Sequence, residues 1–215
     1  MKRNIISFGI IIFFNCLLII ITAHFFNIEA RIIDFLSKDY PSSVVQNYME
    51  SQKKWWWFSY AITPVLIGLK VLLVAFCLNF LKLLDIEGIE KIKFSDFLFL
   101  ALLAELVFVI AGFYKFFNFY WIDTNYSLED VQTYYPLSLL NFKDSISTEK
   151  WLAYPLQVAN LFEIGYWVVL AIGIREFLDN KISFVKSFGL VALTYGIGLL
   201  FWVGVVCFII LNASY

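Results

Sequence analysis

Five long apolar segments constrain the fold of this chain more than any other feature. The hydrocarbon layer of a membrane is roughly 30 Å thick, so a helix needs about 20 apolar residues to cross it. Hydrophobic residues make up 61% of the 215 residues and charged residues only 15%, far from the balance of a soluble domain. The sequence therefore predicts an all-α membrane protein with five transmembrane helices. These helices are expected at residues 5–26, 57–81, 97–119, 152–174 and 187–211.

The connections between these segments leave no room for a separate soluble domain, so residues 1–215 are predicted to form a single transmembrane domain. Basic residues indicate its orientation, because cytoplasmic loops carry an excess of Lys and Arg. Eight of the sixteen basic residues fall in the N-terminal segment and in the short second and fourth loops. We therefore expect a multi-pass membrane protein with a cytoplasmic N-terminus and an external C-terminus. The eight residues are Lys2, Arg3, Lys82, Lys91, Lys93, Arg175, Lys181 and Lys186.

The two long loops, which this orientation places outside, each contain a predicted short helix at the membrane surface. In the first loop, apolar residues such as Phe35 alternate with charged ones, a pattern typical of helices that lie on a membrane, and Pro41 would end that helix. In the third loop, Ser127 is a predicted N-cap, and Pro136 would end the turn or two that follow. These helices either seal the outer face of the bundle or bind an external partner. The residues predicted for such a surface are Phe35, Leu36, Trp55, Trp56, Trp57, Leu139 and Leu140.

Charged residues interrupt three of the apolar segments at one predicted depth. Lys70, Glu105 and Glu163 each lie nine to twelve positions from a charged residue that marks a membrane face. At a helical rise of about 1.5 Å per residue, this places them roughly 14 to 18 Å from that face, in the middle of the bilayer. Asn15 falls at the same depth in the first segment. The sequence therefore predicts a buried polar layer formed by Asn15, Lys70, Glu105 and Glu163.

Three interpretations of this layer remain open. Lys70 could pair with Glu105 or Glu163 to fix the register of the helices, while Asn15 adds a hydrogen bond. An unpaired carboxylate could instead take up and release protons as part of a proton or cation relay. In the third interpretation, one charge meets an opposite charge on another subunit.

The sequence carries no motif of known chemistry. It contains no H-E-x-x-H, no G-x-S-x-G and no glycine pattern of a phosphate or dinucleotide site. The three cysteines have no metal-like spacing, and the net charge of −1 gives no reason to expect nucleic acid as a partner. We therefore expect no enzyme, no cofactor and no metal site.

Three stretches in the last third of the chain carry a resemblance to a known family. Residues 136–140 read PLSLL, residues 156–162 read LQVANLF, and Tyr166-Trp167 leads into LAIGI at residues 170–174 and then a final apolar segment. Together they resemble the bacterial branch of the Yip (Ypt-interacting protein) family over roughly residues 136–210. The resemblance implies five spans, a cytoplasmic N-terminus and a role in membrane trafficking or shaping, and it implies no catalytic residues.

The sequence predicts a non-enzymatic accessory or scaffold subunit of a larger membrane assembly, such as an export or transport complex. Its partners would be other membrane protein subunits and the lipid bilayer. The long, patterned external loops favour this function, and no inverted repeat favours a transporter. Two alternatives remain: a proton- or ion-coupled carrier that uses the buried charges, and a membrane trafficking or shaping protein of Yip type.

Overall fold

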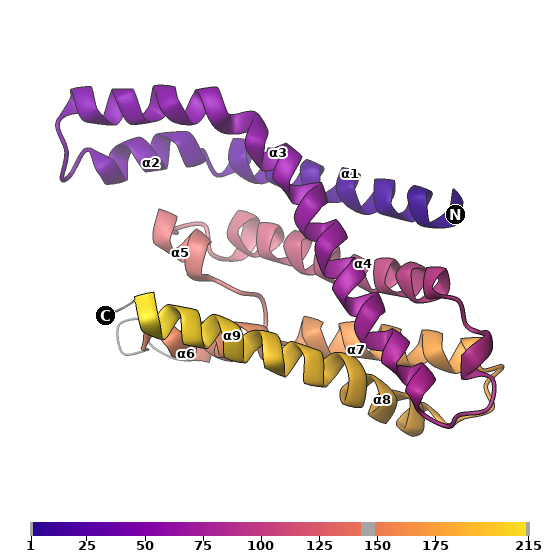
Figure 1. Cartoon of the computed structure of the whole chain (residues 1–215). Coiled ribbons are helices and arrows are strands. Elements are labelled where there is room, and N and C mark those ends of the chain that lie inside the picture. Colours follow the sequence, from indigo (N-terminus) through magenta and orange to yellow (C-terminus); the bar gives the residue numbers. More distant parts are fainter. Residues whose placement is uncertain (1, 143–148, 214–215) are drawn as a thin grey trace.

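The computed structural model describes residues 2–142 and 149–213, and within these ranges the chain is helical with no strand (Figure 1). The longer α-helices are α1 (Lys2–Phe25), α3 (Ser42–Asn79), α4 (Phe94–Phe117), α7 (Leu161–Phe177) and α9 (Ile197–Ala213). The shorter α-helices are α2 (Ile28–Leu36), α5 (Leu128–Thr133), α6 (Lys150–Val158) and α8 (Phe184–Val191). The remaining elements are the 3₁₀ turns η1 (Phe80–Leu83), η2 (Ile89–Lys91) and η4 (Leu139–Phe142) and the π-helical turns η3 (Asn118–Ile122) and η5 (Ala192–Gly196).

Four helical stretches are long and apolar enough to cross a membrane, which indicates a multi-pass membrane protein. They correspond to four of the five predicted segments. The fourth predicted segment differs, because its helix is interrupted between α6, with 9 residues, and α7, with 17 residues. Neither part alone reaches the length of the other stretches. The four stretches are Lys2–Phe25, Ser42–Leu83, Phe94–Ile122 and Phe184–Ala213.

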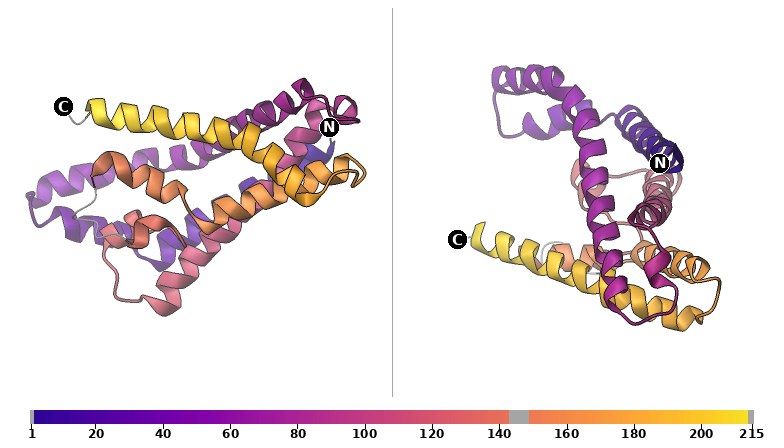
Figure 2. Two further views of the ribbon diagram at one scale, coloured as in Figure 1. Left: turned by 90° about the horizontal axis from the view of Figure 1, so that it is seen from below. Right: turned by 45° about the vertical axis from the view of Figure 1, so that its right-hand side comes forward.

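Helix α4 is the centre of the bundle, and α1, α3 and α7 pack against it (Figure 2). Ala101 and Ala104 are fully buried on α4, and such small side chains let neighbouring helices approach closely. In the most apolar part of α4, 39% of the residues are buried inside the protein. The same share is 6% in α1 and in the stretch that contains α9, so α4 is the more enclosed helix. Arg3 of α1 forms an ion pair of 3.2 Å with Asp96 at the start of α4. The two helices therefore begin at the same end of the bundle and run in the same direction.

Helix α3 begins well before the second predicted segment, at Ser42. Residues 42–56 contain neither glycine nor proline, so nothing in this stretch stops a helix from extending through it. Trp55, Trp56 and Trp57 consequently lie inside α3 and not at its start, which differs from the sequence-based prediction. The three tryptophans therefore do not mark the end of a helix.

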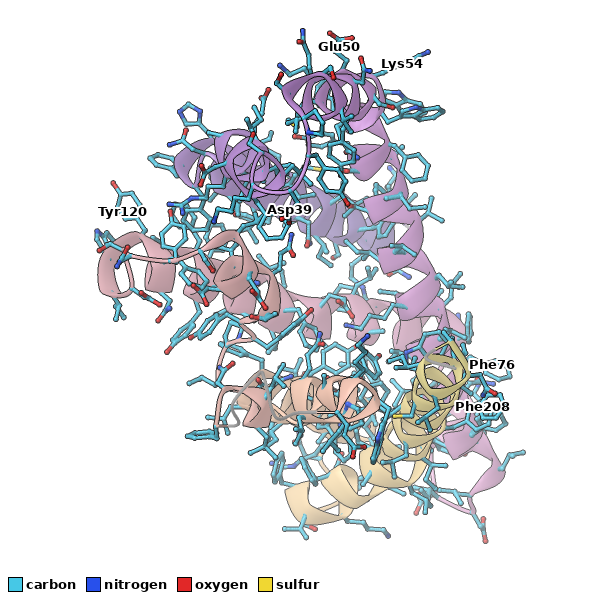
Figure 3. The ribbon with its side chains drawn as sticks, turned by 90° about the vertical axis from the view of Figure 1, so that its left-hand side faces the viewer. Asp39, Glu50, Lys54, Phe76, Tyr120 and Phe208 are labelled. Carbon is cyan, nitrogen blue, oxygen red and sulfur yellow. The ribbon has the colours of Figure 1, made fainter. Side chains whose placement is uncertain are left out.

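Helix α2 and the first part of α3 form a hairpin that projects from the bundle (Figure 1). Lys53 Nζ lies 2.6 Å from Glu29 Oε1 across the hairpin. Glu50 and Lys54 lie on the side of α3 that faces away from the other helices (Figure 3). Beyond the hairpin α3 bends, and Pro64 inside the helix lacks the N–H that would continue the helical hydrogen bonds. The two parts of α3 therefore run in different directions.

Both short helices predicted in the long loops are present, as α2 and α5. Ser127 caps α5 as predicted: its Oγ accepts a hydrogen bond from the backbone N–H of Asp130 at 3.1 Å. In return Asp130 Oδ2 accepts from the backbone N–H of Ser127 at 2.7 Å. The hydrogen bonds from the Ser127 backbone and side chain hold the pKa of Asp130 below its usual range, because they favour the charged form. The position of the two helices at a membrane surface stays a prediction.

Candidate functional site

Lys70 and Glu105 form an ion pair between α3 and α4. Lys70 Nζ lies 2.9 Å from Oε1 and 3.1 Å from Oε2 of Glu105. The Glu105 side chain is 6% exposed, whereas the Lys70 side chain is 40% exposed. The amine also lies 3.7 Å from the centroid of the Phe108 ring, whose face attracts a cation. The carboxylate inside the bundle is therefore matched by a cation of the same chain.

Tyr166 on α7 lies between this ion pair and Tyr195 of η5. Its side chain is fully buried, and its ring centroid lies 5.0 Å from Lys70 Nζ. The same ring lies 5.2 Å from the Phe108 ring and 5.3 Å from the Tyr195 ring, measured between centroids. Side chains from α3, α4, α7 and η5 thus form one continuous buried group.

Glu163 on α7 completes this group. Its Oε1 accepts a hydrogen bond from the Tyr195 hydroxyl at 2.7 Å and another from Trp167 Nε1 at 3.0 Å. Such donors stabilise a partly buried carboxylate, because burial removes much of its contact with solvent. We call these residues the polar cluster. Its members are Lys70, Glu105, Glu163, Tyr166, Trp167 and Tyr195.

The third loop closes the interruption between α6 and α7. The backbone N–H of Leu139 donates to the carbonyl of Ala159 at 3.0 Å, and the N–H of Leu161 donates to the carbonyl of Leu137 at 3.2 Å. These bonds satisfy backbone groups that a continuous helix would have paired within itself. The fourth predicted segment is therefore not one helix, because a distant part of the chain supplies its missing hydrogen bonds.

Asn160 starts α7 and determines where Glu163 lies. Its Oδ1 accepts from the backbone N–H of Glu163 at 2.7 Å, which makes it the N-cap of the helix. Its Nδ2 donates to the carbonyls of Gln157 at 2.9 Å and Val158 at 3.1 Å. Glu163 is thus in the first turn of α7, where the partial positive charge of a helix N-terminus favours a carboxylate.

The π-helical turn η5 positions the other partner of Glu163. A π turn adds a residue to the helix and turns side chains away from the regular helical positions, often at functional sites. Tyr195 lies in this turn and is 5% exposed. The next residue is Gly196, where a Cβ would lie 2.6 Å from Trp167 Cη2. The absence of a side chain there leaves room for the indole that donates to Glu163.

The structure brings together three of the four residues of the predicted polar layer, Lys70, Glu105 and Glu163. Asn15 does not join them. Its Nδ2 donates to the carbonyl of Ile11 on its own helix at 2.8 Å, and it lines a separate pocket between α1 and α4. Counting residues from a membrane face gives the depth of Asn15 but not the side of the helix on which it lies. Residues at one depth can therefore face different sides of the bundle.

Three members of the polar cluster, Tyr166, Trp167 and Tyr195, were not predicted from the sequence. The sequence contains a signal for the first two but not for the third. Tyr166 and Trp167 follow Glu163 by three and four positions, which places them beside it on a helix. This spacing was a usable signal. Tyr195 lies 32 positions from Glu163 in the sequence, and no local pattern connects the two.

The predicted external surface is divided between two places. Phe35 and the three tryptophans belong to the α2–α3 hairpin and are at least half exposed, while Leu36 is partly buried. Leu139, 52% exposed, and the partly buried Leu140 belong to η4, near α6. Figure 1 shows the hairpin and α6 on opposite sides of the same end of the bundle, with α5 between them. The seven residues therefore do not form one surface.

The polar cluster can hold helices together or pass protons among its members. Across residues 2–142 and 149–213, no three His, Cys, Asp or Glu side chains gather closely enough to hold a metal ion. Comparison with models of protein families, with curated proteins and with solved structures finds no match to this chain. The site is therefore interpreted from its geometry, and the resemblance to the Yip family stays a prediction.

Proposed function

We propose that this protein is a non-enzymatic subunit of a larger assembly in a bacterial inner membrane, such as an export or transport complex. The observation that carries the proposal is the unequal exposure of the central ion pair. Glu105 is 6% exposed, but the Lys70 side chain is 40% exposed at a level that the sequence count assigns to the bilayer middle. Hydrocarbon is a poor environment for an ammonium group. Another protein chain with a polar group at this level would cover it.

The surface around Lys70 also suits a helix–helix contact. Leu66 and Leu73, one turn on either side of Lys70, are 57% and 48% exposed. A partner helix could pack on this apolar strip and place one polar side chain at the ammonium group. The two carboxylates of the polar cluster, in contrast, have partners within the chain: Glu105 pairs with Lys70, and Glu163 accepts from Tyr195 and Trp167. They support a structural role for the cluster.

Site-specific photo-crosslinking tests this proposal. A photoreactive residue is introduced at Leu73, which lies about 60° around the helix from Lys70, or at Leu72, about 160° away. Leu72 is a matched control because it is 50% exposed and next to Leu73 in the chain. We expect one protein adduct from Leu73 and none from Leu72. Adducts with lipid alone at both positions would contradict the proposal.

A proton- or ion-coupled carrier is a second candidate, supported by the continuity of the polar cluster. The Tyr166 and Tyr195 rings lie 5.3 Å apart between their centroids, and the Tyr195 hydroxyl, in a π turn, donates to Glu163. In such a carrier, Glu163→Gln would abolish function in a protein that remains folded. Proton-gradient-dependent flux through the purified protein in liposomes, lost in Glu163→Gln, would favour the carrier over the scaffold.

Five spans and a cytoplasmic N-terminus form part of this proposal, with α6 and α7 together as the fourth span. A reporter fused after Tyr215 is expected to be external, and one inserted in residues 85–93 cytoplasmic. The reversed pair would overturn the orientation. A trafficking or membrane-shaping function of Yip type rests on the sequence resemblance alone.

A further inference from the structure

A pocket of about 420 Å³ lies apart from the polar cluster, between α1 and α4. Leu18, Ile19 and Phe116 give it a largely apolar lining, and Ile28 of α2 and Val131 of α5 line the part nearest the loops. This volume is within the range of sites that bind small molecules. The neutral polar groups in its lining, from Asn15 and Thr22, are few, as in sites for apolar ligands.

A lysine, Lys115, lines this pocket, and no carboxylate in the described part of the chain pairs with it. Lys115 on α4 is half buried, and no carboxylate of residues 2–142 or 149–213 lies within 4.0 Å of its amine. The Nζ atom of Lys115 lies 5.5 Å from the centroid of the Tyr135 ring. Arg31 beside the pocket donates only to backbone carbonyls, those of Phe26 at 2.9 Å and Tyr126 at 2.6 Å. The Lys115 amine therefore lines the pocket without a described carboxylate partner, and a bound anion would balance its charge.

The length of the pocket limits the ligand. The lining residues on and just after α1 extend from Asn15 to Phe26, eleven positions apart. At about 1.5 Å per residue this is roughly 16 Å, or about half of a hydrocarbon layer of roughly 30 Å. Such a pocket accommodates an acyl chain from a single leaflet.

We propose that this pocket binds a free fatty acid. The carboxylate pairs with the amine of Lys115, and the acyl chain follows α1 past Leu18 toward Asn15. One amine beside one apolar pocket matches a ligand with one charge and one chain. The same features match a phospholipid with two chains less well. The site is independent of the polar cluster and of the proposed scaffold function.

Binding of radiolabelled palmitate to the purified full-length protein in detergent tests this site. We expect one palmitate per chain and at least about a tenfold loss of affinity in Lys115→Met, the size expected for a lost hydrogen bond to a charged group. Lys115→Arg should keep most of the affinity. Lys54→Met, on the outer side of α3, is the matched control for loss of a lysine. Hexadecanol, which has the same chain without the carboxylate, should bind weakly and be unaffected by Lys115→Met.

A second variant blocks the pocket without changing its charge. Ala23 lines the pocket, and Ala23→Phe should reduce palmitate binding while Lys115 stays in place. Lys115→Met removes an unmatched charge, so folding should persist and the binding result can be interpreted. Equal palmitate affinity in the wild type and Lys115→Met would overturn the proposal. It would also be overturned if native mass spectrometry showed phosphatidylglycerol, and not palmitate, held in a Lys115-dependent way.

Discussion

Lys70 and Lys115 each lie within a long apolar run of a helix, and their surroundings are opposite. Lys70 lies 2.9 Å from the Glu105 carboxylate and 3.7 Å from the centroid of an aromatic ring. Lys115 has no carboxylate within 4.0 Å in the described part of the chain and lines a pocket. A matched cation contributes to helix packing, because removing it strands its partner. An unmatched cation contributes little to packing, so its charge is available to a ligand. The two lysines should therefore respond differently to the same substitution.

The largest expected effect is that of Lys70→Met. It leaves the Glu105 carboxylate buried without a cation, and we expect a loss of about 3 kcal/mol in the free energy of unfolding. Lys115→Met strands no carboxylate and should change stability by less than about 1 kcal/mol. Thermal unfolding of the detergent-solubilised variants, followed by size-exclusion chromatography, measures both. Equal losses from the two substitutions would break the comparison.

The matched pair can be identified further by rescue. Adding Glu105→Gln to Lys70→Met removes the stranded charge, so folded yield should recover in large part. Adding Glu163→Gln should not restore it, because the carboxylate of Glu163 has its own donors in Tyr195 and Trp167. If Lys70→Met recovered with Glu163→Gln and not with Glu105→Gln, the partner of Lys70 would be Glu163.

The next effect tests how closely the polar cluster is packed. In Gly196→Ala the new Cβ would meet the Trp167 ring at 2.6 Å, and the indole could not keep its hydrogen bond to Glu163. We expect a loss of about 2 kcal/mol, typical of overpacking. Gly204→Ala in the same helical stretch is the control, since a Cβ there meets no atom within 4 Å. Palmitate binding should be unchanged in both, because neither residue lines the pocket.

A smaller effect is expected when Glu163 loses one donor. Tyr195→Phe removes the hydroxyl that lies 2.7 Å from Oε1 and leaves Trp167 in place. A hydrogen bond to a charged group contributes about 1.5 kcal/mol at the lower end of its range, and we expect a loss of this size. Tyr120→Phe, at a residue that is 44% exposed and projects from the end of α4 (Figure 3), should have almost no effect. Unfolding midpoints compared at one detergent concentration would show the difference.

The smallest effect concerns α5, which contributes Val131 to the fatty-acid pocket. The pKa of Asp130 is lowered in the folded state, so its cap stabilises the protein fully above the unfolded pKa of about 3.9. This stabilisation is lost as the pH falls below about 4 toward the lowered value. Ser127→Ala should cost less than about 1 kcal/mol at neutral pH and weaken this acid-dependent loss. Unfolding midpoints between about pH 3 and 6 provide the measurement, and an unchanged profile in Ser127→Ala would count against the cap.

Local features of the fold were predictable from the sequence, and those that depend on distant partners were not. The α5 cap was predictable because Ser127 and Asp130 are three positions apart. Four membrane-length helices were predictable because each is a continuous apolar run. The interruption before α7 was not, because the hydrogen bonds that permit it come from Leu137 and Leu139, which lie 24 and 20 positions from their partners Leu161 and Ala159. The early start of α3 at Ser42 was missed for another reason: residues 42–56 are too polar to read as part of a span.

The sequence by itself determined that this is a multi-pass helical membrane protein and that Lys70, Glu105 and Glu163 are charges that need explanation. Both conclusions follow from composition and spacing, because water-free surroundings allow few backbone structures and few unpaired charges. Only the tertiary structure decided which carboxylate lies against Lys70 and which donors reach Glu163. It also separated Asn15 from the cluster and placed it with Lys115 beside a pocket. These outcomes depend on which faces of α1, α3, α4 and α7 meet, and the rotation of a helix about its axis is set by packing among all its neighbours.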